Sequence, residues 1–358
     1  MPTHPPSTPI LAALRAPIVQ APMAGGPSTP ALAAAVNRGG GLGFLAAGYL
    51  SPERVAADIA SVRELTEQPF GVNVFVGAGR PADPERVAAY AQRLGAEAQR
   101  AGVALGTPRF DDDAFVEKIA VLRDAAPAVV SFTFGLAPQA VMDDLRARGS
   151  EVWLTVTSPG EAAAAAAAGA DALIVQGFEA GGHRGVFDDD DEQSELTLLA
   201  ALQLIRARVS LPLIAAGSIM TGAALGAVLV AGASAGQIGT AFLCAGEAAT
   251  SPAQRAATAT EARTVLTRAF SGRTARGIVN RWHREHAAEA PAAYPEVNHL
   301  TSPLRAHGRA SGDADLINLW AGQAHALVQA RAAEELTRAL AADAGKAIAA
   351  AAARLDAA

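Results

Sequence analysis

Short uncharged runs recur along the first 246 residues, and each is followed by a stretch in which apolar residues have helical spacing. The runs are rich in valine, isoleucine and leucine and are bounded by glycine, proline or polar residues, which is the pattern of buried strands. We therefore predict eight strands, at residues 17–21, 42–45, 70–75, 129–132, 152–156, 172–175, 212–216 and 236–240.

Helix-start signals separate these strands. Thr29 and Ser51 are each followed by proline, which places a good N-cap residue before a proline in the first turn. Ser158 is followed three residues later by Glu161, the spacing of a capping box. Helical patterns also cover 84–101, 111–125, 196–206 and 221–230.

Alternation of strand and helix requires a parallel sheet with crossover helices, and eight repeats match a (β/α)8 TIM barrel. The competing architecture is an open doubly wound sheet. That fold usually carries a G-x-G-x-x-G turn after its first strand, whereas this chain has Pro22-Met23-Ala24-Gly25-Gly26 there. We expect the barrel.

The composition changes after Gly246, where the chain becomes arginine-rich, helical in pattern and interrupted by prolines. The sequence predicts three parts: a barrel at 1–246, an inserted, mainly helical subdomain or lid after strand eight at 247–312, and C-terminal helices at 313–358 that return to the barrel. Within the last part we expect helices at 313–327 and 332–355.

Composition narrows the classes of function. A net charge of −6 and a pI near 5.7 argue against a nucleic-acid binder, which needs a basic surface. The single cysteine, Cys244, excludes an internal disulfide and fits a reducing compartment. No secretory signal is recognisable, and glycines and a proline divide the uncharged stretch 209–246 into pieces too short to span a membrane. We expect a cytoplasmic protein without a membrane partner.

The most informative loop is Gln176-Gly177-Phe178-Glu179-Ala180-Gly181-Gly182-His183-Arg184-Gly185, which follows the sixth strand. Paired glycines allow the main chain to lie against a ligand, and a titratable imidazole and a guanidinium follow directly. This arrangement suits an anionic, flat or phosphorylated molecule. The alternative for His183 is a structural histidine that donates to a loop carbonyl, and the alternative for Arg184 is an ion pair with Asp188 or Glu179.

Two further strand ends are suited to a phosphate group. Gly217-Ser218 follows the seventh strand and Gly239-Thr240 ends the eighth, the positions at which barrels often hold phosphate. Met23, Asn73 and Gln176 offer groups that contact the edge of a heteroaromatic ring. A phosphate together with such a ring indicates FMN. We expect no metal, because the acidic run 188–192 is typical of a solvated loop and no zinc spacing exists.

Four segments resemble the nitronate monooxygenases, formerly 2-nitropropane dioxygenases, in particular their bacterial class I branch. They are Ala21 to Gly26, Ser131 to Gly135, Gln176 to Gly185 and Ala215 to Ile219, and the resemblance extends to Ser271-Gly272-Arg273 and Tyr294-Pro295. It implies a (β/α)8 barrel with non-covalent FMN that oxidises alkyl nitronates, such as propionate 3-nitronate, with O2 to carbonyl compounds and nitrite or nitrate. It further implies a flavin semiquinone and no need for NAD(P)H.

The resemblance also implies roles for individual residues. His183 would be catalytic, and Gly25, His183, Tyr294 and His299 would contact substrate. The FMN contacts would come from Ala21, Pro22, Met23, Asn73, Gln176, Gly181, Gly182, Gly217, Ser218, Gly239 and Thr240. The family often has more tyrosines and a lysine near the tail, where this chain has Asn298-His299-Leu300-Thr301-Ser302. His307 and His325 are expected at the surface.

Two other functions stay open at this point. One is an FMN barrel that uses reduced nicotinamide, either a quinone reductase or a flavin-type enoyl-acyl-carrier-protein reductase. The other is a flavin-binding protein without turnover. The expected partners are a small nitronate and O2, with no nucleic acid, and the chain would be a monomer or homodimer.

Overall fold

Eight parallel strands form a closed barrel in the computed structural model, which describes residues 7–77, 80–189 and 195–357. The sheet order is β1-β9-β8-β6-β5-β4-β3-β2, and a bridge between Val19 and Leu42 joins its two ends. The fold class predicted from sequence is therefore confirmed. The barrel strands are β1 (Ile18–Gln20), β2 (Gly43–Ala46), β3 (Phe70–Phe75), β4 (Val129–Thr133), β5 (Glu151–Val156), β6 (Ala172–Gln176), β8 (Leu213–Ala216) and β9 (Ala235–Ile238).

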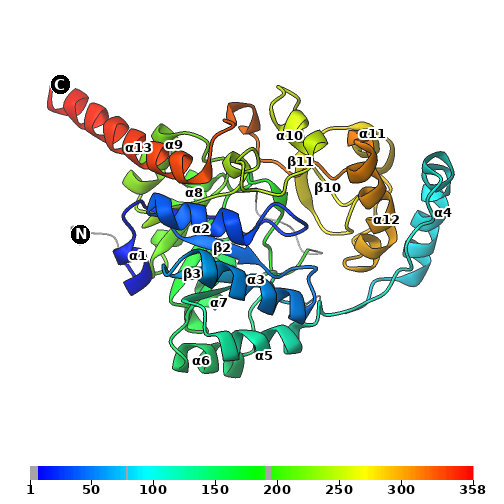
Figure 1. The fold of residues 1–358 in the computed structure, drawn as a ribbon, viewed down its shortest axis with the longest axis horizontal. Coiled ribbons are helices and arrows are strands. Elements are labelled where there is room, and N and C mark those ends of the chain that lie inside the picture. The colour runs from blue at the N-terminus through cyan, green and yellow to red at the C-terminus, as the bar shows by residue number, and fades with distance from the viewer. Residues whose placement is uncertain (1–6, 78–79, 190–194, 358) are drawn as a thin grey trace.

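Helices surround the barrel and bury their apolar stripes against it (Figure 1). They are α2 (Pro30–Gly39), α3 (Pro52–Leu65), α5 (Phe115–Ala125), α6 (Gln139–Ala147), α7 (Pro159–Ala167), α8 (Leu198–Arg206), α9 (Gly222–Val230) and the long C-terminal α13 (Ala333–Asp356). Thr29, Ser51 and Ser158 cap α2, α3 and α7 as predicted, each accepting a bond from a backbone amide of the first turn. Glu161 departs from the capping-box pattern, because its carboxylate accepts from Thr157 and Phe187.

The barrel interior is a separate apolar core. Phe44 and Trp153 lie inside it, with ring centroids 5.9 Å apart, and both are fully buried. The short helix α1 (Pro9–Ala13) adds Leu11 to this cluster. Side chains thus fill the barrel, which leaves the loops at the carboxyl ends of the strands to build a site.

A second apolar cluster lies beyond these loops and joins segments far apart in sequence. It combines α4 (Pro84–Ala101) with α11 (Arg281–His286), α12 (Glu296–Ser311) and the loops around them, and we call residues 84–101 and 269–316 the cap. Figure 1 shows α4 beside α12, far from the barrel helices that precede and follow it in the chain. The boundaries 247 and 312 remain a prediction, and α4 packs with the region between them.

Three elements differ from the helical pattern expected after Gly246. After α10 (Pro252–Thr258), the strands β10 (Thr264–Thr267) and β11 (Ala275–Ile278) form a small antiparallel sheet with β7 (Gly182–His183). The span 313–327 is not one helix, because it holds only the short turns η2 (Ala314–Leu316) and η3 (His325–Leu327). Its apolar residues pack against Ile278, and Trp320 bridges Gly277.

Two smaller expectations are also corrected. The eighth barrel strand ends at Ile238, and Thr240 begins the 3-10 turn η1 (Thr240–Phe242). His325 is buried rather than exposed, because its two ring nitrogens lie 2.9 and 2.7 Å from the carbonyls of Thr258 and Ala262. Among the described helices, none combines the length and the apolar character needed to cross a membrane.

Candidate active site

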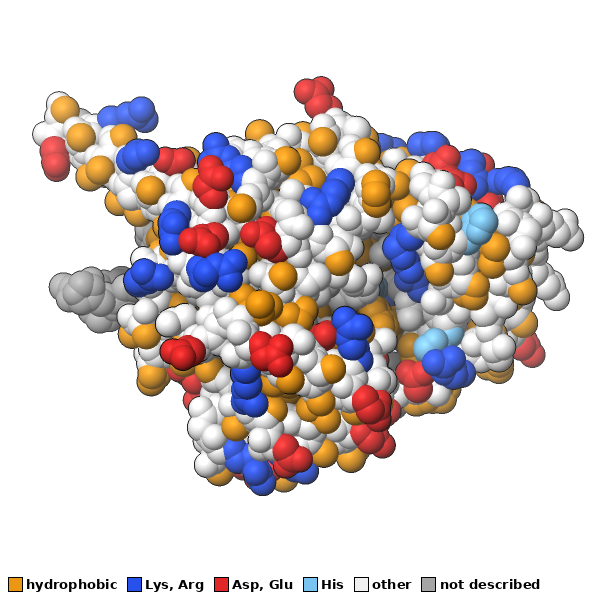
Figure 2. Space-filling view, viewed as in Figure 1, with side chains coloured by type: hydrophobic (Ala, Val, Ile, Leu, Met, Phe, Trp, Pro, Cys, Tyr) orange, Lys and Arg blue, Asp and Glu red, His pale blue; other side chains and the backbone are white. Residues whose placement is uncertain are grey.

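A cavity of about 900 Å³ lies between the carboxyl ends of the barrel strands and the cap. Figure 2 shows the hollow between these two parts, bordered by lysine or arginine side chains. All fifteen site residues predicted from sequence line this one cavity, and they are Ala21, Pro22, Met23, Gly25, Asn73, Gln176, Gly181, Gly182, His183, Gly217, Ser218, Gly239, Thr240, Tyr294 and His299. Its volume is within the usual range of roughly 300–1,000 Å³ for ligand sites.

His183 is held by the cap as well as by the barrel. It belongs to β7, which pairs with β11, so its backbone is part of the small sheet. Its Nε2 lies 2.8 Å from the hydroxyl of Ser271, which donates its own proton to the carbonyl of Arg273 at 3.2 Å. Because that hydroxyl has only one proton, Nε2–H is the donor in the first bond and Nδ1 carries the lone pair.

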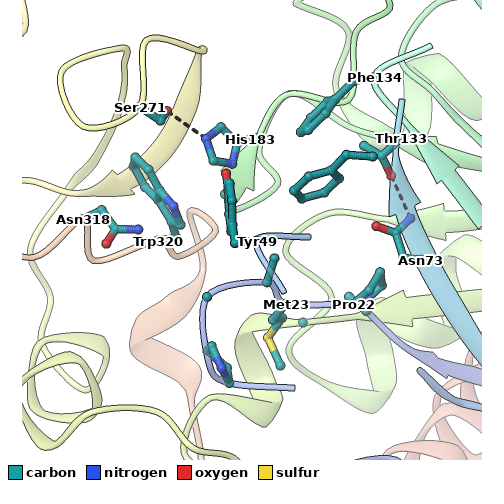
Figure 3. Close-up of a pocket in the computed structure, with 18 of the residues that line it drawn as sticks. Pro22, Met23, Tyr49, Asn73, Thr133, Phe134, His183, Ser271, Asn318 and Trp320 are labelled. Carbon is teal, nitrogen blue, oxygen red and sulfur yellow. Dashed lines mark hydrogen bonds between the residues drawn. The ribbon is translucent and has the colours of Figure 1, made fainter. Parts of the chain in front are cut away.

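The imidazole is neutral at pH 7. Burial, together with the positive charges of Arg273 and Arg305, lowers the pKa of His183 to about 3. Aromatic rings surround it, with the centroids of Trp320, Phe134 and Tyr294 at 5.5, 5.9 and 6.1 Å. Figure 3 shows His183 between Ser271 and the cavity. The cationic surroundings attract an anion, and the neutral imidazole can accept a proton once that anion is bound.

Gln176 fixes the loop that carries His183. Its amide nitrogen donates to the His183 carbonyl at 3.0 Å, and its amide oxygen accepts from the backbone of Gly185 at 2.8 Å. Arg184 donates to the same oxygen and to the carbonyl of Gly177, and its side chain is 1% exposed. Arg184 is therefore not among the described residues that line the cavity, and the guanidinium expected to bind an anion together with the His183 imidazole does not reach the site.

The loops after β8 and β9 present backbone amides to the cavity. The amides of Gly217, Ser218, Gly239 and Thr240 make no hydrogen bond to another described residue. Gly217 has φ 145° and Ser218 has φ 48°, a bend that favours glycine at the first position. The Ser218 hydroxyl donates to Glu179 O, whereas Thr240 Oγ1 accepts from Gly322, which leaves the Thr240 proton for a ligand. This is a suitable cradle for a phosphate.

Other residues that line the cavity offer acceptors. The Asn73 amide nitrogen is directed away, to Ser131 and Thr133 on β4, so its oxygen is the group left for a ligand (Figure 3). Gln237 Oε1 is buried and has no hydrogen-bond partner among the described residues. A buried acceptor without a donor costs about 1–3 kcal/mol, so a ligand with N–H groups is expected here. Acceptors and an amide cradle in one cavity fit a phosphorylated heterocycle.

The cap contributes charged groups that the sequence analysis did not assign. Arg305 lines the cavity and donates to the carbonyl and the side chain of Asn298, both at 2.7 Å, and burial lowers its pKa to about 10. At the rim His299 Nε2 lies 2.8 Å from Asp111, which also accepts from Arg109. Arg305, Arg109 and Asp111 belong to segments without a motif, whereas His299 was assigned from sequence. His299 meets Asp111 because α12 folds over the barrel.

Tyr49, Phe75, Ser271 and Trp320 were missed for a related reason. Each is one aromatic or hydroxyl residue at a strand end or in a loop, where no spacing rule distinguishes it from a core position. The segment 271–273 was noted only as a matching motif. Of the acidic run, 190–192 lie outside the described residues, and Asp189 pairs with Arg268 at 2.9 Å.

The fold and the site define a (β/α)8 barrel enzyme with a large ligand cavity at the carboxyl ends of its strands. Comparison with known proteins gives its family. The family model for nitronate monooxygenase matches residues 8–343. The chain is 42% identical over 342 residues to the nitronate monooxygenase of Pseudomonas aeruginosa, covering 92% of this chain and 96% of that protein. It is 40% identical to that of Paraburkholderia phytofirmans, covering 89% and 90%.

Solved structures agree. The nitroalkane oxidase of Streptomyces ansochromogenes superposes with a TM-score of 0.92 at 46% identity, covering 96% of this chain and 99% of that one. The chain therefore belongs to the nitronate monooxygenase family, and it is an oxidoreductase. FabK from Thermotoga maritima, at 24% identity and a TM-score of 0.74 over 97% of this chain and 96% of that one, shares the fold.

Proposed function

We propose that the chain is an FMN-dependent nitronate monooxygenase, which oxidises alkyl nitronates such as propionate 3-nitronate with O2 to a carbonyl compound and nitrite or nitrate. The observation that carries this proposal is the neutral His183, set among aromatic rings and under the positive charges of Arg273 and Arg305 in a cavity that fits a phosphorylated heterocycle. The family of the chain supports the same reaction.

The residues present suit FMN. The amides of Gly217, Ser218, Gly239 and Thr240 would hold its phosphate, and Asn73, Gln176 and Gln237 would bind the polar edge of its ring. Ala21, Pro22 and Met23 line the cavity between these groups. When bound, FMN supplies the electron acceptor for the nitronate.

The chain itself binds the substrate, excludes water and holds a proton. A nitronate is an anion, so Arg273 and Arg305 attract it and the aromatic wall keeps water from it. The bound anion offsets the positive charges beside His183, which raises the pKa of the imidazole and allows Nδ1 to hold a proton. With a neutral nitroalkane as substrate, the same nitrogen would accept the α-proton.

The test begins with the FMN-loaded protein under nitrogen. We expect propionate 3-nitronate to bleach the visible flavin absorption, and we expect NADH in a parallel cuvette to leave it unchanged. Bleaching by NADH, followed by turnover with a quinone and no response to nitronate, would move the chain to the nicotinamide-dependent reductases. A flavin that neither compound reduces would indicate a binding protein without turnover.

His183→Asn then tests the role of the histidine. We expect kcat/KM for the nitroalkane to fall by about 10²- to 10⁴-fold, the usual contribution of a positioned base. The matched control is His307→Asn, a histidine of α12 that is not among the described lining residues. Equal activity in both variants would exclude His183 from catalysis.

A further inference from the structure

Five described residues that line the cavity and are not glycine have a positive φ, and three of them belong to two segments that a hydrogen bond joins. Tyr49, in the turn after β2, has φ 68°, and Asp113 and Ala114, just before α5, have φ 59° and 52°. Such conformations are uncommon for residues with a side chain and persist where the surroundings determine them. All three residues line the cavity. Strained residues that cluster at a ligand site indicate that they hold a functional group in place.

Asp113 joins two of these positions. Its Oδ1 accepts from the backbone amide of Tyr49 at 3.0 Å, and its Oδ2 lies 2.7 Å from the ammonium of Lys118. The Lys118 side chain is completely buried. Because a buried ammonium without its partner is very costly, this ion pair fixes the Asp113 carboxylate, and the carboxylate in turn fixes the turn that carries Tyr49.

The side chain that is held in this way is a phenol next to a second phenol, that of Tyr294. Burial raises the pKa of both, so both are neutral at pH 7 and each has its proton. A bond between two phenols uses only one of their two protons, so one proton stays available to a ligand. The Tyr49 ring packs edge-on against Phe75, with ring centroids 5.5 Å apart. The residue is 37% exposed and lines the cavity.

The surplus proton lies where an anion would be bound. In Figure 3 the Tyr49 hydroxyl points toward the part of the cavity that holds His183. Arg305 and Arg273 act on the phenols of Tyr49 and Tyr294 with positive charge, and Arg305 lines the same cavity. A fixed O–H beside two guanidinium groups is well suited to one oxygen of a planar anion.

We propose that Tyr49 binds one oxygen of the substrate's nitronate group through its free phenol proton, and that Asp113, clamped by Lys118, is the residue that positions Tyr49. This inference rests on the function proposed above. The clamp explains why the strained turn is kept, since relaxing it would move the phenol out of the cavity.

Tyr49→Phe tests the first half. Loss of one hydrogen bond to a charged group is expected to raise KM for propionate 3-nitronate and lower kcat/KM by about 10- to 100-fold. Nitrate, a planar unreactive anion, serves as a probe that needs no turnover, and calorimetry is expected to show a similar loss of affinity. Tyr90→Phe is the matched control, because that phenol donates to Ala269 in the cap core, away from the cavity.

Two paired variants test the clamp. Asp113→Asn with Lys118→Met keeps an acceptor for the Tyr49 amide but removes the ion pair that fixes it, and we expect a loss in kcat/KM that is smaller than that of Tyr49→Phe. Asp113→Ala with Lys118→Met removes the acceptor as well. We expect it to lose as much as Tyr49→Phe, and adding Tyr49→Phe is expected to cause no further loss, since both changes remove the same contact.

The outcomes separate the two proposals. If the wild type does not respond to nitronate, the proposed function fails. If the wild type responds and Tyr49→Phe matches it in both kcat/KM and nitrate affinity, the role of Tyr49 is wrong. If the Asp113→Ala and Tyr49→Phe losses multiply when combined, Asp113 acts independently of Tyr49 and the positioning role is overturned.

Discussion

The barrel and the cap are stabilised in different ways. Barrel strands pair through a continuous backbone ladder, and the interior is filled by apolar side chains such as Phe44 and Trp153. The cap joins α4 to α11 through the buried carboxylate of Glu97, which accepts from Arg281 at 2.6 and 3.0 Å and from Arg100 and His286 at 3.1 Å. The site lies between a scaffold held by a backbone ladder and a cover held by side-chain contacts, both apolar and charged. We expect the cover to open first.

The largest effects should come from one tryptophan in each region. Trp153→Ala and Trp282→Ala each remove a fully buried ring, at a cost of about 3–5 kcal/mol. Since Trp282 stacks on Phe270 in the cap, we expect its loss to expose amides of α4, α11 and α12 while the barrel strands stay protected. Loss of Trp153 should lower the protection of backbone amides from exchange in both the barrel and the cap.

Hydrogen–deuterium exchange measured peptide by peptide checks this pair. The contrast between barrel and cap requires that the exchange patterns of Trp153→Ala and Trp282→Ala differ. If Trp282→Ala also increases exchange in β3 to β6, the cap and the barrel unfold as one cooperative unit and the contrast drawn here is wrong.

The next effect is electrostatic. Burial alone would raise the pKa of Glu97, but hydrogen bonds from Arg281 and His286, with the charges of Arg281 and Arg100, lower it to about 2 from its ordinary value of 4.5. A folded-state pKa below the unfolded one adds stability above pH 4.5, and that stability disappears as the pH falls toward 2. Acidification should therefore loosen the cap.

Glu97→Gln makes this expectation specific. We expect the variant to lose about 1.5–3 kcal/mol of cap stability at pH 7, because hydrogen bonds to charged groups are replaced by weaker ones. Between pH 4.5 and 2 its cap stability should change less than that of the wild type. Limited proteolysis of α4 across this pH range gives the measurement, and the control is Glu85→Gln, an exposed residue of the same helix. A variant as pH-sensitive as the wild type would assign the acid response to other carboxylates.

The same contrast explains what the sequence could and could not predict. The eight barrel strands and the caps at Thr29, Ser51 and Ser158 depend on local patterns, so they were predicted almost to the residue. The strand ends follow from the barrel, which is why His183 and the glycine loops after β8 and β9 were placed on one cavity.

The cap was predicted poorly because its structure depends on contacts between distant segments. β10 and β11 are short and contain Arg276, so they lack the apolar alternation of a strand, and their partner β7 is about 90 residues away in sequence. The stretch 313–327 has helical spacing, but Ile317, Leu319 and Ala321 bury against Ile278 instead. Arg305, Asp111 and Tyr49 reach the cavity only through such contacts.

The smallest effect compares two N-caps. Ser158 accepts one bond, from Glu161 in α7, so Ser158→Ala is expected to cost about 1 kcal/mol. Asn280 begins α11 and accepts from His283, and its amide also donates to the carbonyls of Ala314 and Ile317 at 2.8 and 2.9 Å.

Asn280→Ala should therefore cost more, about 2–3 kcal/mol, because it removes the N-cap and leaves the buried carbonyl of Ile317 without its donor. Urea unfolding, followed by the fluorescence of Trp282 in a background where Trp153 and Trp320 are phenylalanine, measures the Asn280 variant. Circular dichroism measures the Ser158 variant. If the two variants lose equal stability, each N-cap residue acts only on its own helix. The structure of the cap would then depend on local sequence as much as that of the barrel does.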